Sequence, residues 1–308
     1  MSADAPSPGQ VLGAYTLDRL LGQGGFAWVY EARREDGKSF AVKVLKPRYA
    51  TDPAFESRFR QESVVAAGLA HPNIVHIEEI GSDRGFVFFA MDLYPETLAT
   101  RLAASGHLEE KSLVAISLGV SRALAFAHGR NVIHRDIKPD NVLLGAHDLA
   151  VLTDFGIARA VSGYVAATGF MMTIGTPHYI SPEQAQGRPI DGRTDIYSLG
   201  ITMYRAATGD LPFRSRDWYE LARLHVEAPP EPPRMRRPEL SKRIERIILR
   251  CLAKHPDDRY KTAEELTADL QDIDTRIRPT SEIPLPSGYL PEPERPEAKT
   301  DRKWWKPW

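Results

Sequence analysis

The chain has 308 residues, of which 42% are hydrophobic, and its 40 basic side chains are balanced by 41 acidic ones. This composition is typical of a folded protein and excludes a disordered chain, while the near-zero net charge gives no reason to expect nucleic acid as a partner. The single cysteine, Cys251, excludes an internal disulfide and a zinc site built from several cysteines. Neither a signal-peptide pattern nor a run of roughly 20 apolar residues is found, so we expect a cytoplasmic protein.

The predicted elements divide the chain into two lobes between flexible ends. Residues 1–12 are expected to be a flexible N-terminus. Short β-like runs follow, interrupted by one helical segment at residues 53–69, and they predict a small strand-rich lobe over residues 13–92. The β-like runs are residues 15–21, 28–33, 40–45, 74–80 and 85–91.

Helical periodicity takes over beyond Leu93 and predicts a larger helical lobe over residues 93–273. Its clearest signals are a mainly apolar helix around residues 113–126 and a helix around residues 244–252. Residues 274–308 are rich in Pro, Glu, Ser and Lys, which predicts an extended or disordered tail. The fold class that follows is α+β.

Three glycines lie between the first two β-like runs. We call this segment, residues 21–29 with the sequence Leu-Gly-Gln-Gly-Gly-Phe-Ala-Trp-Val, the glycine loop. Glycines let backbone amides approach phosphate oxygens without a side-chain clash. A strand follows the loop instead of a helix, which argues against a dinucleotide-binding turn. Ala27 stands where a further glycine would complete the phosphate-binding pattern, so a hairpin without a ligand is the alternative.

A lysine interrupts the apolar run at residues 41–45. An unpaired ammonium is costly to bury, so Lys43 is expected to have an anionic partner. Glu62, on the predicted helix, can supply one, and phosphates of a nucleotide can supply another. The alternative is that Lys43 reaches water from an edge strand and Glu62 lies on a solvated helix face.

Two acidic loops follow apolar runs in the helical lobe. Residues 134–141, called here the catalytic loop, read His-Arg-Asp-Ile-Lys-Pro-Asp-Asn and lie between apolar flanks. The second loop begins with Asp154, which ends an apolar strand and precedes Phe155 and a glycine able to turn the chain sharply. Taken alone, Asp154 is also compatible with a turn or cap residue.

These segments, in this order, resemble the signature set of the protein kinases. The set comprises the glycine loop, Lys43, Glu62, the catalytic loop, residues 154–156 and residues 181–183, and the resemblance covers roughly residues 13–273. Residues 181–185 (Ser-Pro-Glu-Gln-Ala) and 195–200 (Asp-Ile-Tyr-Ser-Leu-Gly) are similar to bacterial, eukaryotic-like serine/threonine kinases of the PknB-like type. The resemblance therefore implies a two-lobed kinase fold with an antiparallel N-lobe sheet and one main helix.

The resemblance also implies roles for individual residues. Asp136 is the expected catalytic base, Lys138 stabilises the transferred phosphoryl group, and Lys43 grips phosphates while paired with Glu62. Asn141 and Asp154 are expected to hold Mg²⁺, or Mn²⁺ in its place. ATP contacts are expected from Leu21, Gly22, Gln23, Gly24, Gly25, Phe26, Ala27, Trp28, Val29, Ala41, Lys43, Met91, Asp92, Tyr94, Leu143 and Asp154. Met91 is the expected gatekeeper.

Substrate class and regulation follow from the same resemblance. Lys138 and Thr176 are similar to serine/threonine kinases, so the partners are expected to be proteins with Ser or Thr acceptors. A guanidinium at Arg135, next to the base, favours an anion such as a phosphorylated activation loop. Thr168 and Thr173 are the candidate phosphosites, with unmodified loop threonines as the alternative. Phosphorylation in trans, through a transient homodimer, is a further expectation.

The resemblance also implies that Glu183 and Arg259 form a buried ion pair that serves the scaffold. The segment 302–308 (Arg-Lys-Trp-Trp-Lys-Pro-Trp) combines cations with tryptophans and suits a membrane interface or a partner groove, with a tail that packs on its own domain or is solvated as the alternative. If the natural chain continues beyond Trp308, membrane association is expected.

Two other functions compete with protein phosphorylation. One is a pseudokinase, a folded ATP-binding scaffold without phosphotransfer, but such a scaffold has no chemical need for Lys43, Asp136, Asn141 and Asp154 together. The other is phosphotransfer to a small molecule. It is disfavoured by residues 181–183 and the loop around Thr176, which suit a polypeptide acceptor.

Overall fold

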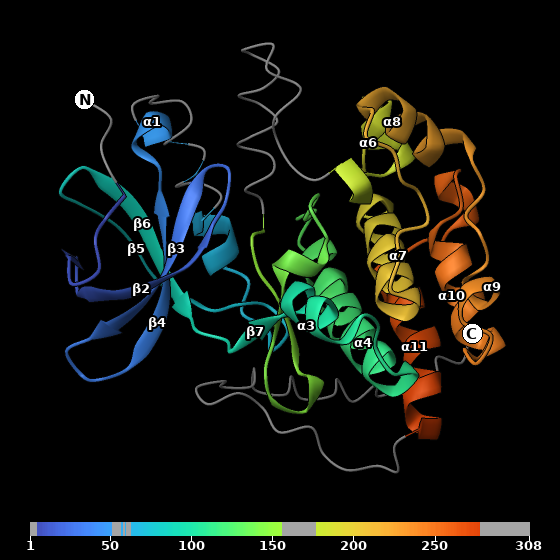
Figure 1. The fold of residues 1–308 in the computed structure, drawn as a ribbon, viewed down its shortest axis with the longest axis horizontal. Helices are drawn as coiled ribbons and strands as arrows, with labels where there is room; N and C mark the ends of the chain where they lie inside the picture. Colours follow the sequence, from blue (N-terminus) through green and yellow to red (C-terminus); the bar gives the residue numbers. More distant parts are fainter. Residues whose placement is uncertain (1–4, 51–56, 58, 60–62, 156–176, 278–308) are drawn as a thin grey trace, which may run out of the picture.

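The computed structural model describes residues 5–50, 57, 59, 63–155 and 177–277. Within them, a small lobe built on a β-sheet stands beside a larger helical lobe, as Figure 1 shows. The chain passes from one lobe to the other through the segment between strands β6 (Phe86–Asp92) and β7 (Glu96–Thr97). The predicted α+β, two-lobed organisation is confirmed.

The small lobe contains a six-stranded sheet with the order β1-β2-β3-β4-β6-β5. Every neighbouring pair in this sheet is antiparallel. The glycine loop spans the end of β2, a three-residue turn and the start of β3. The remaining strands are β1 (Val11–Leu12), β2 (Tyr15–Gln23), β3 (Ala27–Arg34), β4 (Ser39–Leu45) and β5 (Ile77–Asp83).

Alternation along the strands gives the sheet two different faces. One face carries its own core cluster, which includes Tyr15, Trp28, Tyr30 and Phe40. The other face contributes Ala41, Leu45, Phe89 and Met91 to the large core that continues into the helical lobe. The second face therefore looks toward the space between the lobes.

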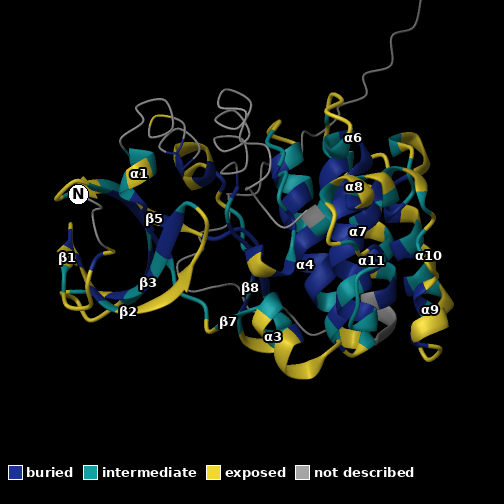
Figure 2. Ribbon diagram, turned by 45° about the horizontal axis from the view of Figure 1, so that its top comes forward, coloured by how far each residue is buried: buried dark blue, intermediate teal, exposed yellow. Residues whose placement is uncertain are grey.

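The helical lobe is organised around two buried helices, α4 (Glu110–His128) and α7 (Arg193–Thr208). Figure 2 shows both as largely dark blue at the centre of this lobe, with α3 and α10 carrying exposed residues further out. The other helices are α3 (Leu98–Ser105), α6 (Pro182–Ala185), α8 (Trp218–Glu227), α9 (Pro233–Arg236), α10 (Lys242–Cys251) and α11 (Ala263–Ile277). A short helix, α1 (Pro47–Ala50), belongs to the small lobe.

Local sequence explains where several of these helices begin and end. Thr97 and Ser181 each form a capping box at the start of α3 and α6, which satisfies otherwise unpaired N–H groups. Helix α7 ends at Gly209, whose left-handed backbone (φ 80°) favours glycine. Within α7, Gly200 lies so close to α10 that an added Cβ would stand 2.6 Å from the Cβ of Cys251. The only cysteine is thus a buried core residue.

A three-stranded sheet, β7-β8-β9, underlies the connection between the lobes. Strands β8 (Val142–Leu144) and β9 (Ala150–Leu152) follow the catalytic loop and precede Asp154. The backbone N–H of Val75 donates to the carbonyl of Leu152 at 3.0 Å, and Leu152 donates to Asn73 at 2.8 Å. Residues before β5 therefore add a short parallel partner to β9, and this fixes Asp154 relative to the small lobe.

Three predicted boundaries differ from the structure. The N-terminal segment is ordered from residue 5, because the Tyr30 hydroxyl donates to the Pro6 carbonyl at 2.7 Å and Leu12 is fully buried. The strand expected at residues 74–80 begins only at Ile77, since Ile74 pairs with Leu152 instead. Helix α11 continues to Ile277, beyond the boundary expected at 273, because no helix breaker occurs before Pro279.

Other predicted elements agree with the structure or lie partly outside it. The main helix expected at residues 53–69 is helical at residues 57, 59 and 63–67, and the chain turns at Gly68. The C-terminal Trp/Lys segment, 302–308, lies outside the described residues. Among the described helices, none combines the length and the apolar character that crossing a bilayer requires.

The buried ion pair of the helical lobe joins α6 to the segment before α11. Arg259 donates to both carboxylate oxygens of Glu183, at 2.8 and 2.9 Å, and its side chain is fully buried. The Thr194 hydroxyl donates to the same carboxylate at 2.7 Å. Burial favours the neutral acid, but the hydrogen bonds and charge of Arg259 outweigh it and hold the pKa of Glu183 below its ordinary value.

Removing one partner of this pair should destabilise the whole lobe. Glu183→Ala leaves the Arg259 guanidinium buried without a counter-ion, and we expect the free energy of unfolding to fall by about 3–5 kcal/mol. Glu227→Ala is the matched control, because its partner Arg223 is exposed and such pairs contribute less than about 1 kcal/mol. Urea unfolding followed by circular dichroism measures both. Equal losses for the two variants would show that the Glu183–Arg259 pair is not a structural anchor.

Candidate active site

The catalytic loop brings two predicted side chains, those of Lys138 and Asn141, to the carboxylate of a third, Asp136. Lys138 donates through Nζ to Oδ2 of Asp136 at 2.7 Å. The Asn141 side-chain amide donates to the same oxygen at 3.0 Å and to the Asp136 backbone carbonyl at 2.7 Å. The Asp136 side chain remains 34% exposed, so the carboxylate is oriented by two donors while still accessible from the space between the lobes.

A short 3-10 turn, η1 (Pro139–Asn141), makes this convergence possible. Pro139 starts the turn, with a fixed φ suited to a first helical position. The turn brings the Asn141 amide back toward Asp136, and β8 begins immediately afterwards at Val142. The backbone N–H of Thr153 donates to the Asn141 carbonyl at 3.0 Å, which links this turn to the strand that leads to Asp154.

A buried carboxylate from helix α7 holds the start of the catalytic loop. Asp195 is fully buried and accepts the backbone N–H groups of His134, at 2.8 Å, and of Arg135, at 2.7 Å. It also contacts Nε2 of His128 at 2.8 Å. Arg135 has a left-handed backbone (φ 72°), a conformation that disfavours residues with a Cβ. The Asp195 contacts therefore offset a strained conformation beside Asp136.

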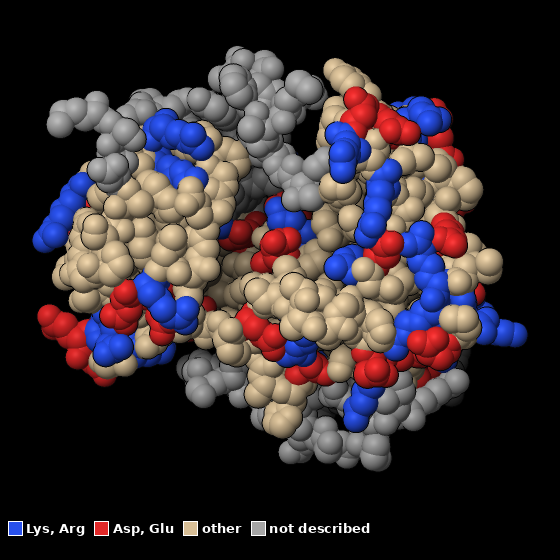
Figure 3. Space-filling view, in the orientation of Figure 1, with Lys and Arg blue, Asp and Glu red and all other residues tan. Residues whose placement is uncertain are grey.

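Lys43 and Asp154 form an ion pair across the two lobes. Lys43 Nζ lies 2.6 Å from Oδ2 of Asp154, and both side chains are largely buried. Burial alone favours the neutral acid, but the nearby Lys43 ammonium holds the pKa of Asp154 below its usual range. The pair joins β4 of the small lobe to the loop after β9. Figure 3 shows acidic and basic atoms side by side in the hollow between the lobes.

The backbone at Asp154 is also left-handed, with φ 66°. Packing around the preceding and following residues fixes this conformation. Nε2 of His134 contacts the Thr153 carbonyl at 2.8 Å, and the His134 ring meets Phe155 edge-on at 4.6 Å between centroids. His134 is fully buried, so these contacts make it part of the packing behind Asp154.

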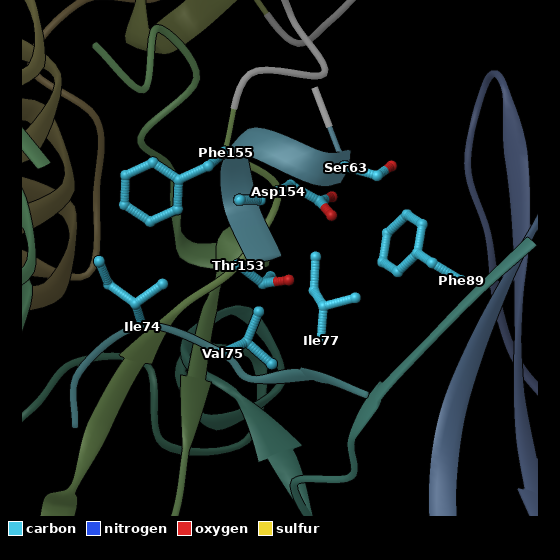
Figure 4. A pocket seen from close by; sticks show the side chains of 9 residues that line it. Ser63, Ile74, Val75, Ile77, Phe89, Thr153, Asp154 and Phe155 are labelled. Atoms are coloured by element: carbon cyan, nitrogen blue, oxygen red, sulfur yellow. The ribbon is translucent and has the colours of Figure 1, made fainter. Parts of the chain in front are cut away.

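Asp154 borders a small cavity of about 10 Å³ behind the ion pair. Figure 4 shows its lining, which is mainly apolar and includes Ile74, Ile77, Phe89 and Phe155. Oδ1 of Asp154 is buried and has no hydrogen-bond partner among the described residues. A buried carboxylate oxygen without a partner is costly, and a cation would satisfy it.

The residues predicted to hold a metal therefore fit that chemistry. Asn141 uses its amide nitrogen on Asp136, which leaves its oxygen as the atom suited to a cation. Mg²⁺ is commonly bound by one or two protein oxygens together with substrate phosphates and water. Among the described residues, no group of three or more His, Cys, Asp or Glu is arranged to hold a metal.

The cleft face of the small sheet carries several of the residues predicted to contact ATP. Ala41 pairs with Met91 across β4 and β6, and Val29 pairs with Lys43 across β3 and β4. Ala41 and Met91 are buried, while Val29 and Leu143 are partly buried against the same core. These positions bring Val29, Ala41 and Met91 to one apolar surface beside Lys43.

Two predicted ATP contacts are refined by the structure. The Trp28 side chain belongs to the core cluster on the opposite face of the sheet, because it is adjacent to Val29 and strand residues alternate. Only its backbone can contribute to the cleft. The Asp92 backbone N–H already donates to the His76 carbonyl at 3.1 Å, so a backbone contact from Asp92 to ATP has to use its carbonyl oxygen. Tyr94 is partly buried close to Asp92.

Several predicted site residues lie outside the described residues. They are Glu62, the expected partner of Lys43, and the activation-segment threonines Thr168, Thr173 and Thr176. The ion pair expected between Glu183 and Arg259 is present as described above.

Sequence reasoning gave no role to Asp195 and Gln184, which hold the backbone of the catalytic loop in place. Asp195 and Gln184 belong to the segments that resemble bacterial kinases, 195–200 and 181–185, but the sequence predicts no contact for either. In the structure, the Gln184 side chain donates to the Arg135 carbonyl at 3.1 Å. The available signal for Asp195 is that it is the one acidic residue of its helix and lies in the first turn. A helix N-terminus favours an acidic residue on its own, so that signal does not predict a contact with a loop some 60 residues away.

Loss of the Asp195 carboxylate should loosen the catalytic loop. In Asp195→Ala, two buried N–H groups lose their acceptor, and we expect the free energy of unfolding to fall by about 1–3 kcal/mol. The amide protons of His134 and Arg135 should exchange faster, as measured by hydrogen exchange with mass spectrometry or NMR. Asp191→Ala is the control, because Asp191 is exposed and contacts Arg193 instead. Unchanged exchange at both amides would contradict the anchoring role.

Comparisons with known proteins agree with this geometry. A family model described as the protein kinase domain matches residues 15–270. The serine/threonine-protein kinase PknB of Mycobacterium tuberculosis is 38% identical over 272 residues, which cover 86% of this chain and 43% of the relative. A probable serine/threonine-protein kinase of Clostridium acetobutylicum is 36% identical over 261 residues, which cover 84% of this chain and 40% of the relative.

Solved structures resemble the fold as well. The crystal structure of the PknI kinase domain of Mycobacterium tuberculosis superimposes with a TM-score of 0.68 at 29% identity, covering 87% of this chain and 99% of that one. The chain spans less than half the length of the two curated relatives. Its two lobes, its cleft with Lys43, Asp136 and Asp154, and the match over residues 15–270 lead to one conclusion: this chain belongs to the protein kinase domain family.

Proposed function

We propose that the chain is a serine/threonine protein kinase, which transfers the γ-phosphoryl group of ATP to a Ser or Thr hydroxyl of a protein. The observation that carries the proposal is the convergence of Lys138 and Asn141 on the Asp136 carboxylate, at 2.7 and 3.0 Å. The Lys43–Asp154 pair stands in the same cleft. The names of the relatives, which are serine/threonine kinases, support the same acceptor class.

Asp136 is the proposed base of the reaction. The acceptor oxygen forms a bond to the γ-phosphorus, the bond from that phosphorus to the β–γ bridging oxygen breaks, and the hydroxyl proton passes to the Asp136 carboxylate. The products are ADP and a phosphorylated Ser or Thr. Lys138 and Asn141 fix the orientation of the carboxylate, which matters because proton transfer requires hydrogen-bond distance.

Positive charge in the cleft stabilises the negative charge on the moving phosphoryl group. Lys138 forms an ion pair with Asp136 at 2.7 Å, and it can reach the transferred group while it remains beside the base. Lys43 is proposed to contact the phosphates from β4, with Glu62 as its partner in the active arrangement. Asn141 and Asp154 are proposed to hold Mg²⁺, which neutralises phosphate charge when it is bound.

The pseudokinase alternative has no specific observation in its favour. Asp136 and Asp154 are both held by lysines in a cleft, and Asp154 keeps a buried oxygen with no hydrogen-bond partner among the described residues. A scaffold that does not transfer phosphate has no need to keep such costly groups buried. Retention of the full set supports an active enzyme.

Acceptor choice and regulation rest on residues at the edge of the cleft. Lys138 and Thr176 support a Ser or Thr acceptor. The Arg135 guanidinium, beside Asp136, is proposed to bind a phosphate on the activation segment, with Thr168 as the first candidate and Thr173 as the second. Trans-phosphorylation through a transient homodimer, and membrane contact by residues 302–308, stay predictions.

The catalytic assignment predicts a sharp loss of phosphotransfer. Incorporation of radiolabelled phosphate into myelin basic protein and into the chain itself should fall about 10²–10⁴-fold in Asp136→Asn, since that variant lacks the base. Lys43→Met should also lose most activity. Asp140→Asn is the matched control, because Asp140 is an exposed carboxylate of the same loop. Equal incorporation by wild type, Lys43→Met and Asp136→Asn would rule out the assignment.

The regulatory assignment predicts phosphate on the activation segment. Wild-type protein incubated with ATP and Mg²⁺ should gain phosphate at Thr168, Thr173 or both, as measured by intact mass and peptide mapping. The Asp136→Asn protein, treated in the same way, is the control and should gain none. If wild type carries no phosphate between residues 160 and 177, the proposed phosphosites are wrong.

A further inference from the structure

The turn of the glycine loop is held by residues that follow β4. Lys46 comes directly after the last residue of β4 and is only 9% exposed. Its Nζ donates to the Gly24 carbonyl at 2.6 Å, and its backbone N–H donates to the Phe26 carbonyl at 2.8 Å. Lys46 thus contacts the loop at two of the three residues of its turn.

Helix α1 completes the attachment. Arg48 donates to the Gly25 carbonyl at 3.0 Å, and the Phe26 and Tyr49 rings pack at 4.9 Å between centroids. The carbonyl groups of three successive residues, 24 to 26, therefore all accept hydrogen bonds from residues 46 and 48. The short sequence 46–49 behaves as a brace for the turn.

The direction of the Lys46 contact is important. Its ammonium lies 5.6 Å from the centre of the Trp28 ring, and Trp28 belongs to the core cluster on the face of the sheet away from the cleft. The Gly24 carbonyl is therefore drawn toward that face. A carbonyl oxygen that pointed into the cleft would repel phosphate oxygens, whereas backbone N–H groups attract them.

The loop has little of its own to fix this arrangement. A Cβ added to Gly22 or Gly25 would meet no atom within 4 Å, so these residues border open space. The Gly24 N–H is bonded to the Ala27 carbonyl at 2.9 Å, and the Gly25 N–H has no hydrogen-bond partner among the described residues. Glycines lose more conformational freedom than other residues when they are ordered, so an external brace lowers that cost for ligand binding.

We propose that Lys46 is a positioning residue for nucleotide phosphates, which acts by holding the Gly24 carbonyl away from the cleft so that the backbone N–H of Gly25 can face the ligand. The inference rests on the proposed ATP-binding function. It concerns binding alone and is therefore testable without turnover. Burial lowers the pKa of Lys46, with the charge of Arg48 as a smaller cause.

The test compares ligands with and without phosphates. In Lys46→Met, the dissociation constant of ATP, measured by isothermal titration calorimetry, should rise roughly ten-fold, the size expected for loss of one hydrogen bond from a charged donor. The dissociation constant of adenosine should stay unchanged, because adenosine has no phosphate. KM for ATP should rise in parallel, while kcat should change less than about two-fold, because uniform binding is lost.

Two further variants separate positioning from general damage. Lys46→Arg keeps a cationic donor and should retain ATP affinity within about three-fold of wild type. Lys38→Met is the matched control, since Lys38 also lies over a ring, that of Phe40 at 4.9 Å, but is exposed at the far end of the β3–β4 hairpin. It should bind ATP as wild type does. Thermal unfolding of each variant, with midpoints close to that of wild type, establishes that the sheet remains folded.

The outcomes are distinct. Weaker ATP binding with normal adenosine binding, rescued by Lys46→Arg, supports the proposal. Equal weakening of ATP and adenosine, or no change in either, overturns it. If Lys46→Met fails to fold, Arg48→Gln tests the same brace from α1 and should weaken ATP binding but not adenosine binding. Wild type that binds ATP without phosphorylating protein would contradict the proposed function and leave this test intact.

Discussion

The buried carboxylate of Asp195 is the contact on which the geometry of the site depends. It accepts two consecutive backbone N–H groups, from His134 and Arg135, at a point where Arg135 is left-handed. A backbone conformation of this kind persists only where the surroundings determine it. Asp195 lies on α7, a helix whose residues are mostly buried. Its contacts therefore attach the loop that carries Asp136 to the core of the helical lobe.

Among the described residues, directional contacts around Asp154 join the two lobes. Lys43 reaches it from the sheet, while the Thr153 carbonyl and the Phe155 ring are held by His134. The parallel backbone contacts between residues 73–75 and Leu152 add a second connection. Because Lys43 belongs to the small lobe and Asp154 follows β9, a movement of one lobe relative to the other changes the distance between these two side chains. The geometry of the predicted phosphate site therefore depends on how the lobes are placed.

Each predicted chemical group in the cleft is supported by a neighbour with a different role. Asp136 is oriented by Lys138 and Asn141, and Asp154 by Lys43. The glycines of the glycine loop have no side chains to do this, and residues 46–49 hold the turn through its carbonyl groups and the Phe26 ring. Rigid support outside the reacting groups lowers the entropy lost on binding and keeps those groups at useful distances.

The sequence by itself determined the lobes, the order of the motifs and the identity of the chemical groups. Strand alternation and helical periodicity are local properties, and Lys43, Asp136, Asn141 and Asp154 stand in segments whose residue types indicate phosphate chemistry. The Glu183–Arg259 pair, which the structure contains, was expected from the family resemblance and not from local rules. The local rules misjudged the N-terminal segment and the end of α11. The N-terminal segment is held by the Tyr30 hydroxyl, which donates to the Pro6 carbonyl. The end of α11 at Ile277 depends on the position of Pro279, the next proline in the chain.

Only the tertiary structure decided which distant groups meet. The contact of Asp195 with Arg135 joins residues 60 positions apart, and that of Lys43 with Asp154 joins residues 111 positions apart. It also decided that Trp28 faces away from the cleft and that Lys46 holds Gly24. Such contacts depend on the packing of whole elements against each other, and a local sequence pattern carries no information about which face of a strand a lysine 22 residues away will reach.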